Sequence, residues 1–246
     1  QSAPELARPF HFNPMALTLA WRAPRGLAAR LGRADGRDPW PAMFRLSLHS
    51  MGGVPADAAP HARLLRELAG GEPWMRYLCG HLELQTTGDT ALAEADFRAA
   101  LAVAPAMWKA EAYVAEMALC RGRAAEAWSR MARLPERLTG PERADARAWR
   151  GAMLLWTGRA REAERELVAA AAGGAQFGRG WLGASRVLAG RPREGLADLD
   201  GTLEGRAPEE EALLWRAEAW SALGKPARAR QDLAAALKLL KSRLQA

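Results

Sequence analysis

The sequence predicts an all-α solenoid of helical hairpins, and two observations carry that prediction. Alanine, leucine, arginine and glutamate dominate the composition, and these residues lose little side-chain freedom in a helix. A short motif that starts with glycine also returns at intervals of 32 to 36 residues. A chain of 246 residues is long for one globular core, but it suits an array of repeats that bury their faces on one another.

The repeated motif reads GDTALA, GRAAEA, GRAREA, GRPREG and GKPARA, and its glycines are Gly88, Gly122, Gly158, Gly190 and Gly224. We expect each glycine to end a helix in the left-handed conformation, with the next helix starting at once. Pro192 and Pro226 fit this scheme, because proline is tolerated in the first turn of a helix. Such a short connection predicts an antiparallel helical hairpin.

Each second helix of these hairpins shows the same pair of apolar positions. A small residue stands five residues after the glycine and a large one follows four residues later, which places both on one helical face. We therefore expect close approach at the small residue and filling of the inter-hairpin space by the large one. The small residues are Ala93, Ala127, Ala163, Gly195 and Ala229, and the large ones are Phe97, Met131, Leu167, Leu199 and Leu233.

The segment GDTALAEADFRAALAVAP, residues 88–105, has the glycine–aspartate turn, the alanine, the aromatic residue and the closing proline of one repeat type. It resembles the tetratricopeptide repeat family, and the resemblance extends from about Trp74 to Leu237. The resemblance implies a right-handed α-solenoid, with first helices on the concave side and second helices outside. The long segment 226–244 is then expected to be the C-terminal capping helix that such arrays need for solubility.

The chain divides into three predicted parts. Residues 1–38 hold several prolines and are expected to form an N-terminal leader or cap, partly irregular. Residues 39–73 are expected to form a degenerate helical hairpin. Residues 74–246 are expected to form five hairpins with an extended C-terminal helix.

Four aromatic residues share one place in the repeat, nine residues before the turn glycine, and a small residue follows each two positions later. By resemblance, this place in the first helix faces the concave groove, where Trp156 would join them. Such a row suits apolar peptide side chains, a partner helix or sugar rings. The alternative is that the rings pack flat on neighbouring helices and close the groove. The four residues are Tyr113, Trp149, Trp181 and Trp215.

Some tetratricopeptide proteins hold a peptide's terminal carboxylate with groove Lys, Asn and Arg residues, and none of these types stands at the matching places here. Those places include Leu78, Leu82, Glu116 and Glu218. We therefore expect an apolar, aromatic groove with Glu116 and Glu218 as spots of negative charge. The formal net charge of +7 comes from arginines spread along the chain, so nucleic-acid binding in the groove is not favoured.

No sequence pattern indicates catalysis. There is no nucleophile elbow, phosphate-binding glycine loop or dinucleotide fingerprint, and the cysteines and histidines have no metal-ligand spacing. We expect no enzyme activity, no cofactor and no metal. No run of 18 apolar residues predicts a membrane span.

The function that the sequence favours is a non-catalytic scaffold for a protein or peptide partner. Two alternatives stay open: an accessory solenoid that binds polysaccharide in the cell envelope, and a helper region of a larger enzyme. The composition is typical of a bacterium with a GC-rich genome. The first residue is Gln1 and not methionine, as after removal of a secretory signal, which favours the bacterial periplasm or cell envelope over the cytoplasm.

Overall fold

The computed structural model describes residues 63–64, 66–67, 70–86, 88–175, 178–204 and 210–245. The predicted leader, residues 1–38, and most of the predicted degenerate hairpin, residues 39–73, lie outside the described residues. All regular secondary structure in the described part is helical. The α-helices are α5 (Pro73–Thr86), α6 (Thr90–Val103), α7 (Trp108–Cys120), α8 (Ala124–Met131), α9 (Gly140–Trp156), α10 (Ala160–Ala172), α11 (Arg179–Leu188), α12 (Pro192–Leu203), α13 (Glu210–Ala222) and α14 (Pro226–Gln245).

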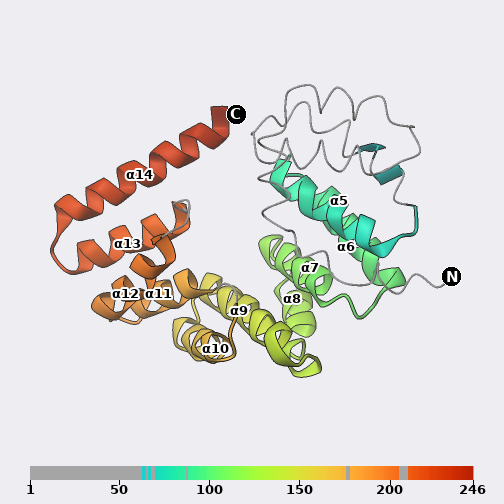
Figure 1. The fold of residues 1–246 in the computed structure, drawn as a ribbon, viewed down its shortest axis with the longest axis horizontal. Coiled ribbons are helices and arrows are strands. Elements are labelled where there is room, and N and C mark those ends of the chain that lie inside the picture. Colours follow the sequence, from blue (N-terminus) through green and yellow to red (C-terminus); the bar gives the residue numbers. More distant parts are fainter. Residues whose placement is uncertain are drawn as a thin grey trace. The chain divides into compact units, whose positions relative to one another are not determined.

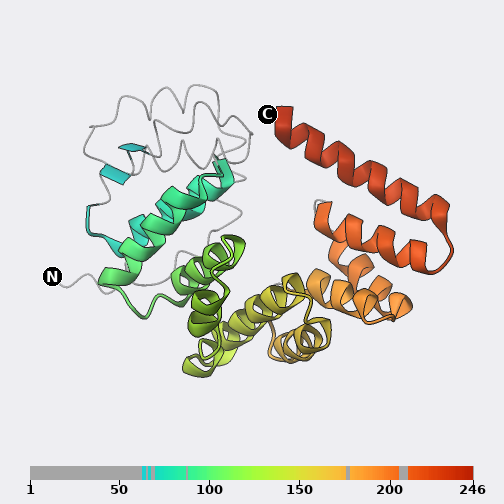
Figure 2. The same cartoon turned by 180° about the vertical axis from the view of Figure 1, so that it is seen from behind.

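The helices pair in chain order as the repeat predicts: α5 with α6, α7 with α8, α9 with α10, α11 with α12, and α13 with α14 (Figure 1). A three-residue 3₁₀ turn, Pro135–Arg137, follows α8. The last pair, α13 and α14, lies side by side in both views of the molecule (Figures 1 and 2). The ten α-helices of the described residues thus form five successive pairs.

The turn glycine between the two helices of each hairpin adopts the left-handed conformation. Its φ is +69° at Gly88, +73° at Gly122, +79° at Gly158 and Gly190, and +69° at Gly224. In the turn at Gly158, the amide of Arg159 donates to the carbonyl of Leu154 over 2.9 Å, which closes the end of α9. No atom crowds these five glycines, so backbone conformation, and not space, is the reason for glycine there.

The small residue of each second helix lets the hairpin close tightly. Ala93, Ala127 and Ala163 have no exposed surface. In the fourth hairpin, a Cβ added to Gly183 of α11 would come within 2.7 Å of Leu199 Cγ and 2.9 Å of the Gly195 carbonyl oxygen. The two helices therefore approach to a distance that a methyl group would not permit.

The large apolar residue of each second helix is buried in the first four hairpins and exposed in the last. Phe97, Met131 and Leu199 are fully buried, and Leu167 is 2% exposed. Leu233 on α14 is 47% exposed, contrary to the expectation that it fills space between hairpins. The reason is its position in the array, because the described residues contain no further hairpin after α14 to cover that face.

The chain divides into two compact units, with the division between Val103 and Ala104 in the sequence. The first unit contains α5 and α6. Arg66 binds two buried carboxylates there, donating to Asp96 Oδ2 at 2.8 Å and to Glu83 Oε2 at 2.9 Å. Arg76 donates to the other oxygen of Asp96 at 3.1 Å. Both acids are thereby compensated inside this unit.

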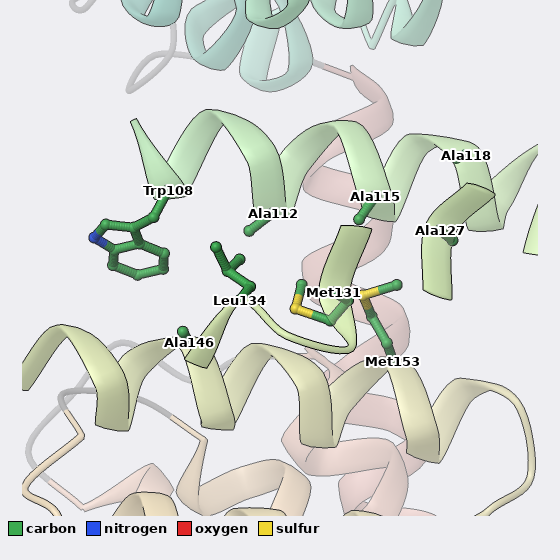
Figure 3. Packing of buried hydrophobic residues seen from close by; sticks show 9 residues of the cluster. All are labelled: Trp108, Ala112, Ala115, Ala118, Ala127, Met131, Leu134, Ala146 and Met153. Atoms are coloured by element: carbon green, nitrogen blue, oxygen red, sulfur yellow. The ribbon is translucent and has the colours of Figure 1, made fainter. Parts of the chain in front are cut away.

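The second unit runs from Ala104 to Gln245 and contains the four hairpins from α7 to α14. Figure 3 shows how its first core forms: small residues of α7, such as Ala112 and Ala115, face Met131 and Leu134, and Met153 of α9 closes the layer. Later cores repeat this scheme around Leu167 and around Leu199. Each hairpin thus completes the core of the one before it.

Arginines also join successive hairpins of the second unit through ion pairs. Arg216 of α13 donates to both oxygens of Asp232 on α14, at 2.8 and 2.7 Å, and to Asp200 of α12 at 2.9 Å. Arg150 of α9 and Arg186 of α11 make similar bridges. These three arginines of first helices therefore pair mainly with acids on the second helices.

Candidate ligand-binding surface

The repeat places five aromatic side chains on four successive first helices of the second unit. Trp149 and Trp156 lie two turns apart on α9 and so share one helical face. We call the set the aromatic surface. Its members are Tyr113 on α7, Trp149 and Trp156 on α9, Trp181 on α11 and Trp215 on α13.

The rings of the aromatic surface contact one another between neighbouring hairpins. Tyr113 and Trp149 meet edge to face, with ring centroids 4.7 Å apart and planes at 82°. Trp156 and Trp181 meet in the same way, at 5.9 Å and 83°. Trp181 and Trp215 both pack on the core around Leu167. The rings are thus held in place by aromatic contacts and by the core beneath them.

The sequence allowed two arrangements of the aromatic row: rings accessible to a ligand, or rings packed on the neighbouring helices. The structure has features of both. Trp149, Trp181 and Trp215 are partly buried against the helices, as the alternative expected. They are not closed over, however: Tyr113 and Trp149 keep some exposed surface, and Trp156 is 42% exposed. The side chains that remain accessible are therefore rigid aromatic groups on an ordered support.

Two of the tryptophans donate their indole N–H to a carboxylate. Trp149 Nε1 lies 3.0 Å from Glu116 Oε2 of α7, and Trp181 Nε1 lies 3.5 Å from Glu211 Oε2 of α13. Glu116 belongs to the predicted site, whereas Glu211, in the first turn of α13, does not. Glu211 stands four residues before Trp215 in the sequence, and this spacing places both side chains on one face of α13.

Glu116 is an unusual carboxylate because burial raises its pKa above the ordinary value. The hydrogen bond from Trp149 acts in the opposite direction, since it stabilises the ionised form. The negative charge of Glu211 raises the pKa of Glu116 further. Glu211 of α13 thus belongs to the charge environment of Glu116 on α7, although the two residues are far apart in the sequence.

A pocket of about 480 Å³ adjoins this surface between α10, α11, α12 and α13. Trp181, Trp215 and Glu211 line one part of it, and Leu167 and Leu182 contribute apolar surface. Its volume is in the range of pockets that hold small ligands or one or two side chains of a partner. Two of the aromatic residues that follow the repeat, Trp181 and Trp215, thus border this pocket.

The polar side of the pocket contains Arg179, Asp198 and Thr202. Asp198 accepts a hydrogen bond of 2.6 Å from Arg186. Arg179 Nε lies 4.0 Å from Asp198, and the Arg179 guanidinium lies against Gly201, where a Cβ would collide with it. The charge of Arg179 is therefore directed toward α12.

The remaining residues predicted for the site lie elsewhere in the structure. Glu218 is exposed on α13. Leu78 is partly buried on α5, and Leu82 on the same helix is fully buried, so Leu82 has no surface to offer a ligand. Both leucines belong to the first unit, whereas the aromatic surface belongs to the second. We do not carry these two residues into the candidate site.

Metal binding and membrane insertion each require a particular arrangement of residues. Across that part of the chain, no group of three or more His, Cys, Asp or Glu side chains is arranged to hold a metal ion. No helix in the same part has the length and apolar character needed to cross a membrane.

No protein-family model matches the sequence, and no curated protein sequence is similar to it. Solved structures do match. A tetratricopeptide repeat protein from Parabacteroides merdae superposes with a TM-score of 0.66 at 14% identity, over 95% of this chain and 94% of the other. PilF of Pseudomonas aeruginosa superposes with a TM-score of 0.55 at 16% identity, over 86% and 93%. With the five glycine-turn hairpins, these matches show that the chain has the tetratricopeptide repeat solenoid fold.

Proposed function

We propose that this protein is a non-catalytic scaffold that binds a protein or peptide partner on the aromatic surface of its second unit. The observation that carries the proposal is the accessible, mutually packed row of aromatic side chains beside a pocket of about 480 Å³. Tyrosine and tryptophan dominate the binding energy of protein interfaces, because they bury large areas with few rotatable bonds.

The packing of these rings favours binding for a second reason. Ordering a flexible side chain at an interface costs free energy that reduces affinity. Here the edge-to-face contact of Trp156 with Trp181 and the core beneath Trp181 and Trp215 fix the rings before a partner arrives. A partner therefore meets a surface that needs little rearrangement.

Affinity capture with matched variants tests the proposal. The tagged protein is used to recover partners from a lysate of the source organism, and each recovered protein is quantified by mass spectrometry. We expect a defined partner whose recovery falls at least about tenfold in Trp181→Ala, as for a central aromatic contact. Val168→Ala is the control, because Val168 is an apolar residue that is 44% exposed on the second helix α10.

The result that would contradict this function is partner recovery that does not depend on the aromatic surface. Circular dichroism of Trp181→Ala must show wild-type helicity and a cooperative melt, so that a loss of binding is not a loss of fold. If the folded variant recovers every partner at the wild-type level, the partner binds elsewhere and the proposal is wrong.

A second candidate is a polysaccharide ligand, which the composition of the pocket supports. Trp181 and Trp215 stand beside polar groups of Asp198 and Thr202, and sugar rings combine stacking on aromatic rings with hydrogen bonds to such groups. Titration with neutral oligosaccharides, followed by tryptophan fluorescence, tests this candidate. A saturable change that is lost in Trp215→Ala supports it, and a flat titration rejects it.

A further inference from the structure

We propose that the outer face of α14 is a second interaction surface, which takes an amphipathic helix of a partner protein with acidic residues beside its apolar face. This surface shares no residue with the aromatic surface. It is built on three leucines of α14 that are 39% to 51% exposed in the structure. We call them the leucine stripe, and they are Leu233, Leu237 and Leu240.

The leucine stripe occupies one face of α14, because residues four and seven positions apart lie one above the other on a helix. Ala229 and Ala236, on the adjoining face, are buried, and α14 packs on α13 (Figure 1). The last helix of a helical array normally turns a polar face to solvent. Three exposed leucines on α14 are therefore not explained by a capping role.

The array itself shows what covers the place of Leu233 in the other hairpins. Leu233 is the ninth residue after its turn glycine, and Leu199 holds the same place in the fourth hairpin. Leu199 is fully buried, in one cluster with Ala212 and Ala219 of α13. The large residues of the two hairpins before it lie in clusters with residues of α9 and α11. A helix with small and apolar residues on one face is thus the group that fits this place.

Acids on the second helices of the array bind arginines of the hairpin that follows. Glu164 of α10 stands six residues after its turn glycine, and its Oε1 lies 3.5 Å from Arg186 Nε of α11. Asp200 of α12 stands ten residues after its turn glycine, and its Oδ1 lies 2.9 Å from an Arg216 guanidinium nitrogen of α13. The covering helix thus brings arginine, and the covered helix supplies the acid.

The charges are reversed on α14. The places of those two acids are taken by Arg230 and Ala234. Lys241 lies about three turns after Arg230, so both cations stand on the same side of the leucine stripe. Neither forms an ion pair within the described residues, and Asp232, the one acid in the sequence of α14, is bound by Arg216 of its own hairpin. A helix that covers the stripe is therefore favoured when it carries acids and not arginine.

This charge pattern decides between the occupants of the leucine stripe. A second copy of this chain is unsuited, because its first helices bring arginines and its own α14 brings the same cations, and like charges across an interface oppose binding. A lipid surface fits less well, since helices that lie on membranes also use Trp and Phe, and α14 has no aromatic residue. An acidic helix gains both apolar burial and charge attraction.

Two helical peptides of opposite charge test this assignment, and α13 is their template because it packs with Leu199 at the equivalent place. The acidic peptide has the sequence Glu210–Ala222 with Arg216→Glu, and the basic peptide has lysine in place of each glutamate. Both are capped and carry a hydrocarbon staple between positions 214 and 218, because a free peptide of this length is barely helical in water. Fluorescence anisotropy measures binding to the full chain. We expect saturable binding of the acidic peptide alone.

Variants of α14 link the binding to the proposed contacts. Leu237 is exposed, so Leu237→Ser leaves the core intact, and we expect at least about a tenfold loss of affinity for the acidic peptide. Leu188→Ser is the matched control, because Leu188 of α11 is 49% exposed and lies outside the leucine stripe. Arg230→Glu is expected to weaken binding of the acidic peptide and to strengthen binding of the basic one.

Three results with the peptides overturn the proposal. Absence of saturable binding by the acidic peptide means that the leucine stripe does not take such a helix. Equal affinity for both peptides means that charge is not recognised. An unchanged affinity in Leu237→Ser, with the control also unchanged, means that the peptide binds elsewhere.

The two other occupants are tested on the same variant. Sedimentation with vesicles of equal parts phosphatidylcholine and phosphatidylglycerol detects lipid binding, and sedimentation velocity detects a dimer. If either is found in the wild type and lost in Leu237→Ser, lipid or a second copy covers the leucine stripe and the proposal is wrong. The capture experiment with Trp181→Ala probes the aromatic surface, so the proposed scaffold function stands or falls separately.

Discussion

Trp149 of the second hairpin in the Ala104–Gln245 unit donates its indole N–H to Glu116 of the first, over 3.0 Å. The bond joins α7 to α9 at a partly buried position and fixes both an aromatic ring and a carboxylate. It shows how neighbouring repeats build a surface that neither hairpin has alone. Trp181 of α11 donates in the opposite direction along the chain, to Glu211 in the following hairpin, over a longer distance of 3.5 Å.

The raised pKa of Glu116 predicts an effect on stability that depends on pH. Because the pKa is higher in the folded state, ionisation of this group opposes folding, and the penalty appears as pH rises above its ordinary value near 4.5 and through the folded value. We expect Glu116→Gln to have a higher melting temperature than the wild type at pH 7. The side-chain oxygen of glutamine can still accept the bond from Trp149.

The sign of this effect can be checked by repeating the thermal melts at lower pH. Near pH 4, below the ordinary value of 4.5, the glutamate is mostly protonated in both states, so the advantage of the glutamine variant is expected to shrink. A melting temperature for Glu116→Gln that lies below the wild type at pH 7, by more than at pH 4, would contradict the assignment of a destabilising charge.

Two glycines on one helix provide a matched test of hairpin packing. In Gly183→Ala of α11, the new Cβ meets Leu199 and the Gly195 carbonyl at less than 3 Å, so we expect a loss of about 1–3 kcal/mol in the free energy of unfolding. In Gly180→Ala the nearest atom is 3.4 Å away, so the higher helix propensity of alanine is expected to stabilise by up to about 1 kcal/mol.

Chemical denaturation of both variants measures these changes. The comparison removes the effect of helix propensity, because both substitutions are glycine to alanine within α11. Equal stability of the two variants would mean that α11 and α12 do not approach as closely as described.

The ion pairs of Arg216 predict a further difference in stability. Arg216→Met keeps an unbranched apolar stem but leaves Asp232, which is nearly buried, without its partner. We expect a loss on the order of 2–3 kcal/mol, below the range for fully buried pairs because Arg216 is 23% exposed. Arg123→Met, which removes an exposed pair with Glu126, is expected to cost about 0.2–1 kcal/mol.

Urea denaturation distinguishes these two arginines. A cost for Arg216→Met no larger than for Arg123→Met would show that the bridge from α13 to Asp200 and Asp232 does not hold the last hairpins together.

The sequence was sufficient to predict the hairpins because their signals are local. A glycine with positive φ and a small residue five positions later act within one hairpin, so a single chain segment reveals them. The exposure of Leu233 was not predictable in this way, since it depends on whether another hairpin follows α14. Position in the array decides burial there, not the repeat pattern.

The candidate site was predicted in part for a similar reason. The aromatic residues follow the period of the repeat, and Glu116 stands at a place that the family resemblance marks. Glu211 belongs to no repeated pattern. Its hydrogen bond from Trp181 and its effect on the pKa of Glu116 both depend on how the helices pack, which the sequence does not reveal. The pocket is likewise a product of packing between hairpins.

The most direct test of the central claim is site-specific photocrosslinking in living cells. A photoreactive phenylalanine analogue is placed at Trp156, on the aromatic surface, or at Val168, on the second helix α10; the two residues are 42% and 44% exposed. If the aromatic surface binds the partner, position 156 forms a discrete crosslinked species and position 168 does not. Crosslinking at position 168 without any at position 156 would contradict the account.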